Sequence, residues 1–160
     1  MWQRQQVTSN QDPVIKTEVI THSTDTSDET RPLCNETYKV ADDEPRNIQI
    51  ASIGVDMCIQ KVGIDQHNAI AVPDNIHVAG WFVDSPYLVV RGVSIIDGHV
   101  PGRYNDAIFV NLAKVKSGEV IRVELGDGSW KIFEAVDNTS YTVDKVMDIC
   151  LSQSKAQRVN

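Results

Sequence analysis

The sequence lacks several features that would assign a protein to a functional class at once. No run approaches the ~18 consecutive apolar residues of a membrane span, and the opening MWQRQQVTSN lacks the apolar segment of a signal peptide. The protein is therefore either cytosolic, or its export signal lies outside the 160 residues. Basic residues are also few, because 15 Lys and Arg stand against 22 Asp and Glu. This balance argues against nucleic-acid binding, which usually needs a concentrated basic face.

Cysteine is scarce and unevenly placed. The three cysteines, Cys34, Cys58 and Cys150, are widely spaced and form no Cys-x-x-Cys pair. We therefore expect neither a structural zinc site nor a disulfide framework, and no metal or cofactor is indicated. Cys34 lies in a polar segment and Cys58 in a strand-like one, so neither is a good candidate nucleophile. Cys150 falls on an apolar helical stripe, where a cysteine acts as a small hydrophobic residue.

Composition divides the chain into two parts. Residues 1–44 are polar, and their segment THSTDTSDETRP has no apolar period, which indicates a disordered linker or arm. The composition changes at Pro45. Residues 45–160 are long enough to bury a core, and we expect them to form one folded domain.

The pattern of this domain is mainly β. Short segments rich in Val and Ile are separated by Gly, Pro, Asn and Asp, as is typical of a barrel or sandwich. The expected strands are NIQIASI, MCIQKVG, AIAV, IHVAGWF, LVVRGVSII, EVIRVEL and SWKIFEAV. The last two flank Gly126-Asp127-Gly128, a strong hairpin signal. In TVDKVMDICLSQ the apolar residues instead recur at helical spacing, which predicts one short helix near residues 143–152.

Four histidines are the candidates for acid–base chemistry. His22 lies in the polar arm, His67 in a turn-like stretch, and His77 at the start of a strand, each without a partner pattern. His99 is better placed, because it follows an apolar run and precedes a Pro-Gly turn, where a fold can present a side chain to a groove. Asp97 would share its face of the strand. Pattern alone supplies no nucleophile for His99.

From residue 43 onward, the segments together resemble the bacterial sortases. EPRNIQIASIGVD is similar to the Pro-x-x-Ile-x-Ile-Pro-x-Ile opening of the sortase barrel, and AVPDNIHVAGWF to the family's Val-Pro segment and Gly-Trp-Tyr/Phe strand. SIIDGHV resembles the strand that ends in the catalytic histidine. AIFVNLAKVKSGEVIRVELGDG resembles the stretch that leads into a hairpin. The order and spacing of these pieces make the match specific, and it is nearest to the class D, E and F enzymes.

The resemblance implies a closed, eight-stranded sortase-like β-barrel and a cysteine transpeptidase. In that family a thiolate attacks a carbonyl in the sorting-signal peptide of a secreted surface protein and forms a thioester. An amine of cell-wall peptidoglycan or of a pilin then resolves it. The implied location is the extracytoplasmic face of the bacterial cell membrane, with the membrane anchor outside this chain and the polar arm as its linker. The role of acid and base falls on His99.

Two family motifs are absent from the sequence. Neither the Leu-x-Leu-x-Thr-Cys strand nor the arginine of the next strand has a counterpart, and we transfer those roles neither to Cys150 nor to Arg158. Ala51 stands where the family often has proline, and LVVRGV replaces an expected Pro-Gly loop. We expect a domain truncated before the catalytic strand, inactive alone, with an open edge that favours aggregation. The alternatives are a degenerate binding or structural module, and an enzyme whose nucleophile is Cys150.

Overall fold

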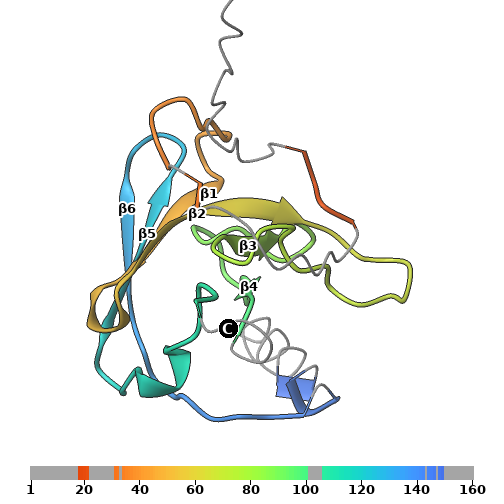
Figure 1. Ribbon diagram of the computed structural model, residues 1–160, viewed down its shortest axis with the longest axis vertical. Coiled ribbons are helices and arrows are strands. Elements are labelled where there is room, and N and C mark those ends of the chain that lie inside the picture. The colour runs from red at the N-terminus through yellow and green to blue at the C-terminus, as the bar shows by residue number, and fades with distance from the viewer. Residues whose placement is uncertain are drawn as a thin grey trace, which may run out of the picture.

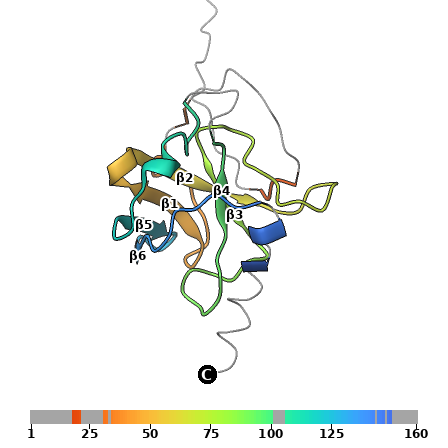
Figure 2. The same cartoon turned by 90° about the horizontal axis from the view of Figure 1, so that it is seen from below.

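The structure is a computed structural model that describes residues 18–21, 31–32, 34–100, 106–142, 144–146 and 148–149. Its strands form one six-stranded sheet in the order β4-β3-β2-β1-β5-β6 (Figures 1 and 2). The elements are β1 (Pro45–Ile50), η1 (Ala51–Ile53), β2 (Val55–Val62), β3 (Ala79–Phe82), β4 (Ile96–Gly98), η2 (Leu112–Lys114), β5 (Val120–Leu125) and β6 (Trp130–Glu134). The mainly β prediction is confirmed.

The sheet is open in the part of the chain that the structure describes. Figure 1 shows it curving, with β5 and β6 on one side of β1 and β2 and with β3 and β4 on the other. The two outer strands, β4 and β6, do not pair with each other. The expected closed barrel is therefore not seen here.

One strand pair of the sheet is parallel. β2 and β3 run in the same direction, whereas the other neighbouring pairs are antiparallel. A parallel pair cannot be joined by a tight turn, and the connection runs through residues 63–78. This long connection carries Pro73 and His77 to the β3–β4 side of the sheet.

Strict alternation gives the sheet one core face and one outer face. In β2, Met57 and Ile59 point into the main core, where Ile48 and Trp81 also lie. Cys58 and Val62 point to the outer face and belong to two smaller clusters. A period of two puts successive side chains on opposite faces of a strand.

The hairpin expected at residues 126–128 is present. Gly128 has φ of 83°, and its N–H donates to the Leu125 carbonyl oxygen at 3.0 Å. Leu125 N–H in turn donates to the Ser129 oxygen at 2.8 Å. β5 and β6 then pair from Glu124 opposite Trp130 onward, as the alternating pattern predicts.

Two predicted strands are wrong. AIAV forms only an isolated bridge between Ile70 and Ile64. LVVRGVSII contributes a strand only at its end, because Val90 N–H closes a turn onto the Tyr87 oxygen and Gly92 has φ of 143°. Val90 is 54% exposed, so an apolar run does not guarantee a buried strand.

The predicted helix is seen in part. Residues 144–146 and 148–149 have helical backbone, and Val146 N–H donates to the Thr142 oxygen at 3.0 Å. The other residues of the predicted segment lie outside the described residues. No described helix has the length and apolarity required to cross a membrane.

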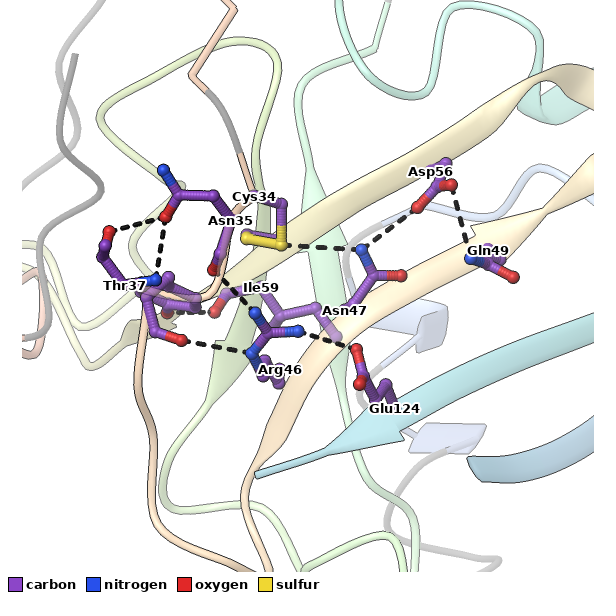
Figure 3. Close-up of a disulfide and its surroundings, with 11 residues drawn as sticks. Cys34, Asn35, Thr37, Arg46, Asn47, Gln49, Asp56, Ile59 and Glu124 are labelled. Carbon is purple, nitrogen blue, oxygen red and sulfur yellow. Dashed lines mark hydrogen bonds and ion pairs between the residues drawn. A yellow bond between two sulfur atoms is a disulfide. The ribbon is translucent and has the colours of Figure 1, made fainter. Parts of the chain in front are cut away.

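The expectation of no disulfide is wrong, because Cys34 and Cys58 are joined (Figure 3). Their Cα atoms are 5.3 Å apart, within the range that a disulfide needs. The sequence gave no signal for this bond, because the number of cysteines is odd and the two partners are 24 residues apart. The bond attaches residues preceding β1 to the outer face of the sheet. The division of the chain at residues 44 and 45 itself stays a prediction, since most of the polar arm lies outside the described residues.

Candidate functional site

An apolar groove lies on the core face of the sheet, between β4 and the β5–β6 hairpin. Its volume is about 580 Å³. Its floor and walls come from strand residues, from the loop before β4 and from the segment that follows His99: Ile48, Ile50, Tyr87, Leu88, Val90, Gly92, Val93, Ser94, Ile96, Asp97, Gly98, Val100, Phe109, Leu112, Ile121, Val123 and Phe133. Val90 and Val100 are more than half exposed at its rim. Such a surface suits an apolar peptide side chain.

The loop before β4 is held over the sheet by Trp81 and Ser85. The Trp81 indole N–H donates to Ser94 Oγ at 3.2 Å, and its ring lies 5.2 Å from that of Tyr87. Ser85 Oγ donates to the Phe82 oxygen and accepts from Ile95 N–H. These contacts hold the loop in place as one wall of the groove, although the loop has no regular secondary structure.

Gly98 positions the end of β4. A Cβ at this residue would lie 2.7 Å from Phe109 Cε2, so the close approach of the phenyl ring requires glycine. Phe109 N–H also donates to the His99 carbonyl oxygen at 3.0 Å. The Gly-His pair of the sequence therefore fixes the backbone of His99 against the segment that carries Phe109.

The His99 imidazole is half-buried and engaged. Its Nε2 lies 2.9 Å from the carbonyl oxygen of Pro73. A carbonyl oxygen can only accept, so Nε2 carries the proton in this bond, and in the neutral ring Nδ1 holds the lone pair. Gly98 and Val100 line the groove, whereas the His99 ring contacts the loop on the other side of β4. His99 thus stands beside the groove rather than within it.

Asp97 shares the Pro73 side of β4 with His99, as its spacing predicts. It pairs with Gly80 of β3, which in turn pairs with Gln60 of β2. A Cβ on Gly80 would overlap Asp97 Oδ1, so the missing side chain is what makes room for this carboxyl group. Asp97 Oδ1 is buried without a hydrogen-bond partner. Burial raises the pKa of Asp97 from 3.8 to about 7.

The row from Gln60 through Gly80 to Asp97 was not identified by sequence reasoning. Gln60 is 1% exposed, and its Oε1 also has no hydrogen-bond partner. The available signal in the sequence was that Gln60 and Asp97 are polar residues within apolar segments. The register that brings them to one row across three strands cannot be read from the chain.

The other candidate residues that the structure describes do not join this site. His77 is buried, and its Nδ1 lies 3.1 Å from the Asp106 carbonyl oxygen, a contact that supports the local packing. His67 is exposed in a turn capped by the Asp65 carboxylate. His22, Cys150 and Arg158 lie outside the described residues.

The structure brings no described thiol to His99. Cys34 and Cys58 are consumed by their disulfide on the outer face of β2. Neither can act as a nucleophile in this state, because nucleophilic attack needs a free thiolate. The candidate site therefore consists of the groove, His99 and the buried Asp97.

Comparison with known proteins relates the chain to a family of domains. No curated protein matches the chain. A sequence model of the sortase domain matches residues 48–159, which is most of the chain and includes all of the groove and His99. Together with the single curved sheet and the histidine at the end of β4, this match shows that the chain belongs to the sortase family.

Proposed function

We propose that this chain is the histidine-bearing part of a cysteine transpeptidase that joins surface proteins to an amine. The family match is the observation that carries this proposal. In the proposed reaction a thiolate attacks a backbone carbonyl of a sorting-signal peptide, the peptide bond breaks with release of an amine, and a thioester forms. An amine of peptidoglycan or of a pilin subunit then attacks the thioester and releases the thiol.

His99 is the proposed acid and base. The bond from Nε2 to the Pro73 oxygen holds the ring and leaves Nδ1 free to take a proton from a thiol or an incoming amine. The same nitrogen then returns that proton to the leaving amine. The backbone of His99 is held by Phe109, so the ring is placed from two directions.

The groove is the proposed site for the apolar part of the peptide. Its floor is formed by the core faces of β1 and β5, and its rim by exposed Val90, Val100 and Phe133. Side chains of this kind would contact an apolar side chain of the bound peptide.

The proposal assigns the nucleophile to none of the described residues. The sequence holds no Leu-x-Leu-x-Thr-Cys motif, and both described cysteines form the disulfide. We therefore propose that the described residues alone do not form the thioester, and that the site also uses a cysteine and an arginine that are not among them.

The disulfide supports an extracytoplasmic location for this protein. Disulfides persist in secreted and surface compartments and are rare in a reducing cytosol. Cys58 is fully buried, whereas Cys34 is only partly buried. The proposed location at the cell surface agrees with the proposed substrate, a secreted surface protein.

The peptide-binding step is tested by titrating the protein with synthetic sorting-signal peptides and following amide shifts by NMR. Val90→Lys at the groove rim should weaken binding at least about tenfold, because it places a charge in an apolar site. Ile132→Lys is the matched control, since Ile132 is 70% exposed on the outer face of β6. Equal loss of binding in both variants would contradict the groove assignment.

The chemistry is tested by adding a synthetic segment with a Thr-Cys strand and an arginine strand, together with a peptide and glycine amide. The expected result is amide product only in the mixture, and its loss in His99→Ala. Product from His99→Ala at the wild-type rate would refute the role of His99. Product from the chain alone that Cys150→Ser abolishes would make Cys150 the nucleophile instead.

A non-catalytic binding module is the second candidate function. The observation that favours it is the capture of His99 Nε2 by Pro73 and of both described cysteines by their disulfide. Peptide binding in the groove without product in any mixture would support this function over the first.

A further inference from the structure

The Cys34–Cys58 disulfide lies at the centre of a small clasp on the outer face of the sheet (Figure 3). We define the clasp as residues 34–40 together with the side chains that hold them. Cys58 and Tyr38 are buried there and form a cluster of their own, separate from the main core. The Tyr38 hydroxyl donates to the Ile59 carbonyl oxygen of β2. The clasp therefore closes over one strand of the sheet by one covalent bond and by side-chain contacts.

Arg46 of β1 is the second fastening of the clasp. Its Nε donates to the Tyr38 carbonyl oxygen at 3.1 Å, and a terminal nitrogen donates to the Asn35 carbonyl oxygen at 2.7 Å. The other terminal nitrogen binds the Glu124 carboxylate of β5 at 2.8 Å. Figure 3 shows this side chain between the clasp and β5. Arg46 thus binds the clasp through its main-chain oxygens, and this binding does not depend on the side chains of Asn35 and Tyr38.

A buried oxygen beside the clasp lacks a hydrogen-bond partner. Asn47 is paired in register with Cys58, and its Nδ2 contacts Cys34 Sγ at 3.6 Å, but its Oδ1 is buried without a hydrogen-bond partner. A buried oxygen without a donor loses the hydrogen bond that water would supply. Opening the clasp lets water reach Asn47, so the non-covalent balance favours opening more than the contacts alone suggest.

We propose that the Cys34–Cys58 disulfide is a redox-sensitive clasp, whose reduction releases residues 34–40 from β2 while the sheet stays folded. An external dithiol supplies two electrons and two protons. The bond between the two sulfur atoms breaks, Cys34 and Cys58 become thiols, and the dithiol is oxidised to its own disulfide. The released face contains Cys58, Asn47 and the Ile59 carbonyl oxygen.

The release stops before β1 because a second anchor holds the following residues. Gly126 N–H donates to the Glu44 oxygen at 3.0 Å, and Asp127 N–H donates to the Asp42 oxygen at 3.1 Å. A Cβ at Gly126 would overlap the Ala41 carbonyl oxygen, so the hairpin turn is packed tightly on this segment. Residues 41–44 therefore stay in place, and the groove on the opposite face of the sheet is unaffected. The proposal does not depend on the proposed transpeptidase function.

Hydrogen exchange followed by mass spectrometry tests the clasp on the protein as it exists. The oxidised protein and the protein reduced with dithiothreitol are compared in native buffer, and intact mass confirms a gain of about two mass units. In a peptide that covers residues 34–40, exchange of the Tyr38 amide should become at least about tenfold faster on reduction. This amide is buried with its side chain and donates to the Asn35 carbonyl oxygen in the closed clasp, and opening removes that protection. Exchange in β5 and β6 should stay unchanged, which provides the internal reference.

Two variants separate the disulfide from the other contacts. Cys34→Ser with Cys58→Ser should exchange like the reduced protein and should not respond to dithiothreitol. Asn47→Leu keeps the branched shape but removes the unpartnered oxygen, together with the Nδ2 contacts to Asp56 and Cys34. Its reduced form should therefore stay closed more than the reduced wild type if the buried oxygen favours opening. Unchanged exchange at residues 34–40 on reduction would overturn the proposal. Faster exchange throughout the sheet would overturn it as well, because the bond would then stabilise the whole domain.

Discussion

Replacing Asp97 with asparagine changes how stability depends on pH. Asparagine has nearly the same shape as aspartate but does not ionise. Asp97 Oδ1 occupies the space beside Gly80 that Pro73 and Val62 also flank, and these three residues carry no charge. Burial outweighs the hydrogen bond from its own backbone and raises the pKa of Asp97 from 3.8 to about 7.

The sign follows from this upward shift. Below pH 3.8 the carboxyl group is protonated in both the folded and the unfolded chain, and it imposes no penalty. As pH rises from 3.8 through about 7, the unfolded chain releases its proton before the folded chain does, so wild-type stability falls. A difference of roughly three pKa units corresponds to about 4 kcal/mol of lost stability above pH 7. Local relaxation and water entry reduce this ceiling to about 2–4 kcal/mol.

Urea unfolding of the wild type and of Asp97→Asn between pH 4.5 and 8.5 measures this difference directly. Taking the difference between the two proteins cancels the titration of all other groups that the substitution does not touch. Asp127→Asn is the control, because Asp127 is exposed and hydrogen bonds from Ser129 lower its pKa. That variant should show no gain at high pH. A constant difference between wild type and Asp97→Asn across the range would refute the assigned burial of this carboxyl group.

Two further substitutions test the packing around the candidate site. Gly80→Ala should destabilise the protein by about 2–3 kcal/mol in denaturant unfolding, because the new Cβ overlaps Asp97 Oδ1. In the double variant Gly80→Ala, Asp97→Ala the added loss from Gly80→Ala should largely disappear. If the two single effects simply add, the contact is refuted. Ile132→Lys, at an edge strand and 70% exposed, should lower light scattering at high concentration while changing stability by less than about 0.5 kcal/mol. Scattering that stays as high as in the wild type would place self-association elsewhere.

The local part of the fold could be predicted from the sequence, and the non-local part could not. The β5–β6 hairpin was predictable because alternation and an Asp-Gly turn act within a few residues. Cys34 and Cys58 meet only because β2 pairs with β1 and the preceding segment folds back over it. The apolar run before β4 forms a loop because Trp81 and Ser85 hold it against the sheet as one wall of the groove.

The candidate site was predictable to the same extent. His99 and its position after a strand follow from a short motif. Its contact with Pro73 depends on the long connection between parallel β2 and β3, which brings residue 73 beside residue 99. The buried state of Asp97 depends on the absence of a side chain at Gly80 of the neighbouring strand. The spacing of residues near His99 in the sequence predicts neither arrangement.

The central position of β1 bears on how the chain folds. β1 pairs with β2 across a short connection, but it also pairs with β5, where Ile48 lies opposite Val123. The first contact closes a small loop, and the second closes a loop of more than half the domain, which costs more chain entropy and is slower. The β1–β2 pair and the β5–β6 hairpin can therefore form early and independently, whereas the docking of β5 on β1 sets the rate of folding. Core substitutions at Ile48 should slow refolding, while those at the far end of β6 should mainly speed unfolding.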